Sequence, residues 1–153
     1  RIKKEPNKLK NDYWESYCSY PNRYLNRKLF DIEVESLKKL FEKSNIELLV
    51  FVTGIILEQI KKKNDETAFN EINDSDFLIA ELTTKSIGVG IEIGYAFAKK
   101  IPIINLRKKN AEYSTTASGS SPYSVEYENE FDLNESMEEL LIQMNKNYLQ
   151  QRV

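Results

Sequence analysis

The sequence contains no histidine and only one cysteine, Cys18. Without histidine, catalysis by a Ser-His-Asp or Cys-His arrangement is excluded, and so is a zinc site with histidine ligands. A single cysteine can form neither an internal disulfide nor a four-cysteine zinc site, which favours a reducing, intracellular setting. Catalysis by this chain must therefore depend on carboxylates, tyrosines, serines, backbone amides or a bound cofactor.

Long apolar runs are missing as well. No stretch is long and apolar enough to span a membrane, and the basic start RIKKEPNKLK has no apolar segment behind it that would make a signal peptide. The formal net charge of −2 gives no reason to expect nucleic-acid binding. We therefore expect a cytoplasmic protein, or a nuclear one in a eukaryote, with no membrane and no nucleic acid as partners.

The length of 153 residues suits one domain. We expect a basic tail over residues 1–11 and a single domain over 12–150. Apolar runs predict strands at 46–52, 76–82 and 101–106. The aromatic, partly alternating segment 12–19 predicts a first strand, and 125–130 is expected to be a last short one. Apolar periodicity predicts helices at 21–45, 55–74, 90–100 and 134–150, the second broken around Asn64 and Asp65 and the last with a capping box from Ser136 to Glu139.

Strands that alternate with helices predict an α/β fold, a flavodoxin-like (Rossmann-like) doubly wound five-stranded parallel sheet with helices on both faces. Ligands of such sheets bind beyond the carboxyl ends of the strands. Asp74 and Asp76 precede their strand and are expected to be structural, whereas Glu81 and Glu92 lie at the carboxyl end. The polar segment 107–124 is long for a loop and predicts a lid or a disordered stretch.

The stretch KSIGVGIEIGYAFAKKIPIIN, residues 85–105, places Gly88 and Gly90 in the turn from a strand into a helix. Such a turn offers free backbone amides and the positive end of the helix dipole, which together suit a phosphate. Glu92, expected in the first helical turn, would stay ionised and could act as a nucleophile. The alternative reading is a surface glutamate favoured by the dipole, beside a tight turn whose glycine spacing differs from the dinucleotide-binding pattern. Gly94 and Ala96 of this stretch are expected to be small residues that allow the helix to pack closely on the sheet.

Residues 73–107 resemble the nucleoside 2-deoxyribosyltransferase superfamily, and within it the branch of 2′-deoxynucleoside 5′-phosphate N-hydrolases. The resemblance rests on an acidic residue that opens a buried strand, an Ala-Glu pair near its end, and the run SIGVGIEIGYA. Serine, glycines and glutamate of that run all fall in register with the branch. The first seventy residues match it poorly.

The resemblance implies a glycosidase that needs neither a metal nor another cofactor. Glu92 falls on the nucleophile that attacks C1′ of the deoxyribose and expels the base. Water then hydrolyses the glycosyl ester, so that the configuration at C1′ is retained. The resemblance also implies a homodimer.

The phosphate-binding residues follow from the same resemblance. Ser86, Gly88 and Gly90 fall on the loop that holds the 5′-phosphate. Ser19 matches a serine after the first strand that contacts phosphate, and Ser114 matches a serine contributed to the neighbouring subunit's site.

The chain departs from the family around the first strand. Cys18 stands where the family has a glycine, and Glu15 stands where it has a tyrosine, so that Tyr17 or Tyr20 would have to replace the tyrosine. Arg23, in the loop that follows, is either a bidentate phosphate partner or a solvated loop arginine.

A second departure concerns the carboxylate that orients the substrate and handles protons in the branch. Ala68 occupies its position, and Asp65, three residues earlier on the same helical face, is the residue that could replace it.

Three functions therefore remain open. The first is hydrolysis of deoxynucleoside 5′-monophosphates to free base and deoxyribose 5-phosphate. The second is transfer of the deoxyribosyl group to another base, and the third is nucleotide binding without catalysis. The run Ser-x-Gly-Val-Gly favours a phosphorylated substrate and hence the hydrolase.

Overall fold

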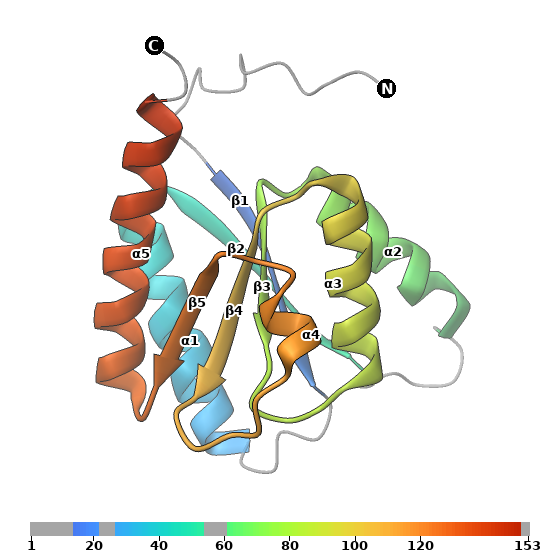
Figure 1. Cartoon of the computed structure of the whole chain (residues 1–153), viewed down its shortest axis with the longest axis horizontal. Helices are drawn as coiled ribbons and strands as arrows, with labels where there is room; N and C mark the ends of the chain where they lie inside the picture. Colours follow the sequence, from blue (N-terminus) through green and yellow to red (C-terminus); the bar gives the residue numbers. More distant parts are fainter. Residues whose placement is uncertain (1–13, 22–26, 54–60, 151–153) are drawn as a thin grey trace.

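The structure is a computed structural model, and it describes residues 14–21, 27–53 and 61–150. Five strands alternate with helices along the chain (Figure 1). The elements are β1 (Trp14–Pro21), α1 (Arg27–Lys43), β2 (Ile46–Thr53), α2 (Lys61–Asp74), β3 (Phe77–Glu81), α3 (Ile87–Lys99), β4 (Ile103–Lys108), α4 (Thr115–Ser118), β5 (Tyr123–Tyr127) and α5 (Glu130–Gln150).

The strands form one sheet in the order β2-β1-β3-β4-β5, and each neighbouring pair is parallel. The chain runs from β1 outward to β2 and then crosses to β3 on the other side of β1. The point where the strand order reverses therefore lies between β1 and β3, as in one common type of doubly wound sheet. The prediction of an α/β fold with a parallel sheet and helices is confirmed.

Two layers of helices cover the sheet. Helices α1 and α5 pack on one face, and α2 and α3 pack on the other (Figure 1). In β3, Phe77 and Ile79 belong to the core between the sheet and helices α1 and α5, called the first core. Leu78 and Ala80 belong to the second core, between the sheet and helices α2 and α3. A strand that is covered on both faces is apolar at nearly every position, which explains the continuous apolar run FLIA of β3.

The C-terminal helix begins earlier than its apolar pattern indicates. Its apolar stripe is confirmed, because Met137, Leu141 and Met144 are buried. The helix starts at Glu130, so the predicted capping box from Ser136 to Glu139 is wrong, since both residues lie inside the helix.

The cap of α5 lies at Asn129 instead. Asn129 Oδ1 accepts a hydrogen bond from the Asp132 backbone N–H at 3.1 Å. Asp132 Oδ2 in turn accepts one from the Glu128 N–H at 2.9 Å. The first of these bonds satisfies a backbone donor that a helix start leaves without an acceptor, and the second binds the residue before the cap to the first turn.

The predicted break in the second helix is also wrong, because α2 runs without interruption from Lys61 to Asp74. Asn64 and Asp65 each cost only a fraction of a kcal/mol in a helix. Packing outweighs this cost, since Ala68 and Ile72 are buried against the second core.

The polar segment after β4 is neither a long lid nor structureless. Strand β4 extends to Lys108, the one-turn helix α4 follows, and β5 begins at Tyr123. Asn105 Nδ2 in β4 donates to the Ala117 carbonyl of α4 at 2.9 Å and holds the segment on the sheet. Among the described helices, none has the length and apolar content that a membrane crossing requires.

Candidate active site

The carboxyl ends of the strands meet at one edge of the sheet, to which the strand arrows in Figure 1 point. The loop 82–86 leaves β3 at this edge and leads directly into α3. Because the strand order reverses between β1 and β3, this edge is where a doubly wound fold binds its ligand. Asp74 and Asp76 lie exposed at the opposite edge, away from the carboxyl ends of the strands.

Helix α3 begins three residues earlier than predicted, at Ile87, with Ser86 at the N-cap. Gly90 N–H donates to the Ser86 carbonyl at 3.1 Å, which is a helical hydrogen bond. Gly88 and Gly90 therefore lie inside the first turn and not in a loop before it. Val89, with 1% of its surface exposed, anchors this turn in the second core and offsets the helix-breaking tendency of the glycines.

The start of α3 keeps the features that suit a phosphate. The backbone N–H groups of Ile87, Gly88 and Val89 are the first-turn amides, which have no acceptor within a helix. The Ser86 hydroxyl does not cap the helix. A Cβ atom at Gly90 would meet no described atom within 4 Å, so the space beside this turn is open to a ligand.

Gly94 and Ala96, both predicted to allow close packing on the sheet, differ in the structure. Ala96 is fully buried, as predicted. Gly94 is exposed, and a Cβ atom there would also meet no described atom within 4 Å. The packing prediction is wrong for Gly94, because this position faces outward.

Glu92 is buried, with 4% of its surface exposed. It lies in the second turn of α3, on the stripe whose other members are Val89, Ile93 and Ala96. This stripe faces the sheet, where α3 contacts β1 and β3. The placement in the first turn and the alternative reading as a surface residue are thus both wrong. Burying a carboxylate is costly, and a fold retains such a group most often where it has a function.

Strand β1 contains two predicted site residues. In the register of β1 with β3, Tyr17 pairs with Leu78 and Ser19 pairs with Ala80. Helix α3, which carries Glu92, contacts both of these strands. Arg23 lies outside the described residues.

Asp65 lies in α2, one turn before Ala68. Ala68 itself is buried and carries no polar group. Helix α2 runs antiparallel to the strands, so Asp65 is closer than Ala68 to the carboxyl edge of the sheet.

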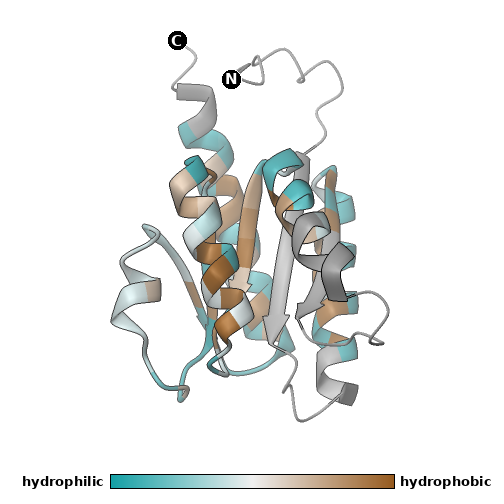
Figure 2. Ribbon diagram, turned by 90° about the vertical axis from the view of Figure 1, so that its right-hand side faces the viewer, coloured by the Kyte–Doolittle hydropathy of each residue, from teal (hydrophilic) through white to brown (hydrophobic). Residues whose placement is uncertain are grey.

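Ser114 takes a local role as the N-cap of α4, where its Oγ accepts a hydrogen bond from the Ala117 N–H at 3.4 Å. It also lines a pocket of about 350 Å³ between α3 and α4. Gly90, Gly94 and Phe97 form the α3 side of this pocket. Figure 2 shows α3 in the middle of the view with hydrophobic residues along it and the short α4 to its left.

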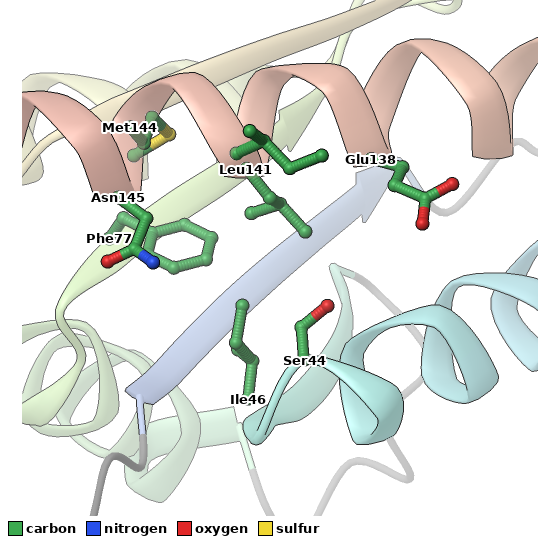
Figure 3. Close-up of a pocket in the computed structure, with 8 residues that line it drawn as sticks. Ser44, Ile46, Phe77, Glu138, Leu141, Met144 and Asn145 are labelled. Atoms are coloured by element: carbon green, nitrogen blue, oxygen red, sulfur yellow. The ribbon is translucent and has the colours of Figure 1, made fainter.

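Another cavity, of about 260 Å³, lies at the amino edge of the sheet (Figure 3). Ile46 and Phe77, the first residues of β2 and β3, line it on one side, and side chains of α5 line it on the other. Its lining residues are Ser44, Ile46, Phe77, Glu138, Leu141, Ile142, Met144 and Asn145. This cavity lies at the edge opposite to Glu92 and is not part of the candidate site.

Sequence reasoning placed Glu81 at the correct edge but assigned it no role. The side chain is fully buried at the end of β3. Its Oε1 accepts a hydrogen bond from the Thr83 N–H at 3.1 Å and another from the Thr83 hydroxyl. Its Oε2 has no hydrogen-bond partner within the described part of the chain. The signal in the sequence was a lone carboxylate at the end of an apolar strand.

Burial raises the pKa of Glu81 from its ordinary value of 4.5 to about 7. The hydrogen bonds from Thr83 oppose this rise, the negative charge of Glu33 adds to it, and the positive charge of Lys108 lowers the pKa. Glu81 therefore changes its charge near neutral pH. Over the described residues, no group of three or more acidic or cysteine side chains is placed to hold a metal ion.

Comparison with known proteins supports the inferred resemblance. No protein-family model matches the chain. Over 46 residues, the chain is 48% identical to a protein of Syntrophotalea carbinolica that is named as a candidate 2′-deoxynucleoside 5′-phosphate N-hydrolase. This match covers 30% of the chain and spans about a third of the relative, 32% of its length.

Solved structures with a similar fold extend over most of the chain. The CMP N-glycosidase BcmB of Clostridium botulinum superimposes with a TM-score of 0.60 at 19% identity, covering 80% of this chain and 97% of that one. A 2-deoxyribosyltransferase of Bacillus psychrosaccharolyticus gives a TM-score of 0.57 at 10% identity, covering 78% and 90%. At these identities the likeness is one of fold.

The chain resembles the nucleoside 2-deoxyribosyltransferase superfamily, and within it the 2′-deoxynucleoside 5′-phosphate N-hydrolases. The motif of residues 73–107 and the fold of the whole domain agree on this point.

Proposed function

We propose that the chain is an N-glycosidase that hydrolyses 2′-deoxynucleoside 5′-monophosphates to free base and deoxyribose 5-phosphate. The observation that carries the proposal is the burial of Glu92 in the second turn of α3, directly after the open first turn that contains Gly88 and Gly90. A carboxylate and an anion site are thereby held on one rigid helix. A nucleotide whose phosphate binds the first turn would present its sugar to the interior side of the same helix.

In the proposed reaction, a carboxylate oxygen of Glu92 attacks C1′ while the bond from C1′ to the base nitrogen breaks. The electron pair of that bond leaves with the base, which takes up a proton. Water then attacks C1′ of the glycosyl ester, Glu92 leaves as a carboxylate, and the configuration is retained. Asp65 and Tyr17 are the proposed groups that orient the sugar and transfer protons.

The phosphate is proposed to bind at the start of α3. Ser86 would donate its hydroxyl, and the first-turn amides would donate their N–H groups, at the positive end of the helix dipole. The N–H of Gly90 is used by the Ser86 carbonyl, so Gly90 contributes open space instead of a donor. Ser19 and Arg23 are proposed as further phosphate partners.

We further propose that the enzyme is a homodimer in which Ser114 reaches the neighbouring subunit's phosphate. Three apolar side chains of α3 are exposed, Ile87, Ile91 and Phe97. Together with the pocket in which Ser114 lies, they form an apolar surface that a second copy could cover.

Release of free base is the decisive measurement. The protein is incubated with deoxyribo- and ribonucleoside 5′-monophosphates and with the unphosphorylated nucleosides, and the base is quantified by chromatography. We expect release from a deoxynucleoside monophosphate. The Glu92→Gln variant should lower the rate by at least about a thousandfold, which corresponds to ~4 kcal/mol of lost transition-state stabilisation. The control variant Glu139→Gln, which alters an exposed glutamate of α5, should retain the rate.

The same experiment separates the alternatives. Release that requires a second free base would identify a deoxyribosyltransferase. Nucleotide binding without release, and unchanged in Glu92→Gln, would identify a binding module and contradict the proposal. Cys18 and Ala68, which replace family residues, motivate this last alternative.

A further inference from the structure

The loop 82–86 connects β3 to the start of α3, and the buried side chain of Glu81 holds it in place. Glu81 Oε1 accepts hydrogen bonds from both the backbone N–H and the hydroxyl of Thr83. The Thr83 Oγ1 in turn accepts a hydrogen bond from the backbone N–H of Lys108 at 3.0 Å. The Thr83 hydroxyl therefore connects the end of β3 to the end of β4.

The exposed contact of this loop is weaker. Lys85 Nζ lies 2.6 Å from Glu112 Oε1, but both side chains are about 70% exposed. Exposed ion pairs contribute little to stability because water screens them. The loop is thus held mainly by the buried carboxyl group and by the backbone hydrogen bond from the Leu82 N–H to the Leu106 carbonyl at 2.7 Å.

Two charged groups from other elements act on the Glu81 carboxyl, Glu33 of α1 and Lys108 of β4. Glu33 of α1 is buried, and its Oε1 lies 3.1 Å from Lys108 Nζ of β4. Glu33 Oε2 accepts a hydrogen bond of 3.3 Å from the Tyr127 hydroxyl at the end of β5. The cation of Lys108 is therefore bound by Glu33, and Glu81 has no cation of its own among the described residues.

We propose that Glu81 is a positioning residue for phosphate binding, whose ionised carboxylate fixes Thr83 and whose protonation loosens the loop 82–86. This inference rests on the proposed function, since it concerns the same phosphate site. Hydrogen bonds to an ionised acceptor are roughly twice as strong as bonds to a neutral one. A proton taken up by Oε2 turns Oε1 into the oxygen of a neutral acid and weakens both bonds from Thr83.

The change of charge falls in the neutral range, since burial places the pKa of Glu81 at about 7. The loop should therefore be held firmly above neutral pH and less firmly below it. Phosphate affinity should follow, because the loop sets where Ser86 and the first turn of α3 lie.

The loop itself can be tested without any substrate. The amide resonance of Thr83 is followed by NMR between pH 5.5 and 8.5 in the wild type and in Glu81→Gln, which keeps an acceptor oxygen but cannot ionise. We expect the wild-type resonance to titrate with a midpoint of about 7, and the variant resonance to stay constant. A titration with the same midpoint in Glu81→Gln would overturn the proposal.

Binding is tested with 2-deoxyribose 5-phosphate by calorimetry at pH 6 and pH 8. The second ionisation of the phosphate, with a pKa of about 6, lowers affinity at pH 6 in every variant. Beyond this shared effect, the affinity of the wild type should be about a further fivefold lower at pH 6 than at pH 8. This is the size expected when hydrogen bonds to an ionised acceptor become bonds to a neutral one. Glu81→Gln should lack the further loss. Thr83→Val, which removes the hydroxyl between the strands, should bind weakly at both pH values.

The outcomes distinguish the two proposals. Equal pH dependence in the wild type and in Glu81→Gln would overturn the role of Glu81, whatever the enzyme hydrolyses. If no variant binds the sugar phosphate while Thr83 titrates only in the wild type, the proposed function fails, and Glu81 stands as the residue that fixes the loop. Thermal unfolding of each variant confirms that it is folded.

Discussion

At the scale of single residues, two buried glutamates lie at the carboxyl edge of the sheet, one on each face. Glu92 lies on the buried side of α3, and Glu81 lies at the end of β3 on the side of α1 and α5. Each is more than nine-tenths buried. A fold that keeps two carboxyl groups out of water gives up stability at this edge, which is the usual cost of a functional site.

The pH dependence of stability should reveal Glu81 directly. Because the pKa is raised from 4.5 to about 7 on folding, the native state retains a proton that the unfolded state releases between these values. The contribution of Glu81 to the free energy of unfolding is therefore fully present below pH 4.5 and is lost as the pH rises through about 7. We expect the free energy of unfolding to fall by up to ~3 kcal/mol over this range.

Urea denaturation at stepped pH measures this loss. Glu81→Gln should remove it, whereas Glu139→Gln should follow the wild type. Identical profiles for the wild type and Glu81→Gln would show that the carboxyl ionises as freely in the native state as in the unfolded chain. Under the expected result, the ionised form, which should fix the loop best, is the less stable form of the fold.

At the scale of elements, α3 combines a helix start suited to an anion, a buried carboxylate and an outward face of small and apolar residues. Its first turn was predicted as a loop because two glycines in three residues disfavour a helix locally. The packing of Val89 in the second core stabilises this turn as a helix nevertheless. The same competition explains α2, where buried Ala68 and Ile72 outweigh the preference of Asn64 and Asp65 for turns.

Gly94→Ala tests the open face of α3. A Cβ atom at this exposed position meets no described atom within 4 Å. Alanine should therefore raise the free energy of unfolding by about 1 kcal/mol through helix propensity alone. Chemical denaturation measures the change, and Ala96→Gly, at a fully buried position of the same helix, should destabilise the protein instead. A loss of stability in Gly94→Ala would indicate that the second copy of the proposed dimer packs closely against Gly94 itself.

At the scale of the whole molecule, the exposed apolar residues of α3 and the pocket beside α4 determine how two copies could meet. Phe97, with 61% of its surface exposed, lies at the rim of this pocket. Light scattering should give twice the chain mass of 17.9 kDa for the wild type. Phe97→Lys should give a monomer, because a charge buried in an apolar interface has no partner.

The matched control is Phe131→Lys, which alters a phenylalanine of α5 with 77% of its surface exposed. We expect this variant to remain a dimer. If Ser114 acts across the interface, base release should fall in Phe97→Lys together with the dimer fraction and should be preserved in Phe131→Lys. A wild-type monomer with full activity would contradict the proposed dimer.

The sequence by itself determined the order of strands and helices, the single parallel sheet and the edge at which a ligand should bind. These properties depend on the local pattern of apolar and polar residues, which can be recognised from the sequence alone. The motif of residues 85–105 likewise placed Ser86, Gly88, Gly90 and Glu92 together, because one helix and the loop before it carry them all.

Only the tertiary structure decided which of these residues are buried and what they contact. The burial of Glu92, the exposure of Gly94 and the anchoring of α4 by Asn105 all depend on elements that are distant in the sequence. The surroundings of Glu81 are the clearest case, since Glu33, Lys108 and Tyr127 come from α1, β4 and β5. A charge in a protein acts through its spatial neighbours and through the exclusion of water, and neither is set before the chain has folded.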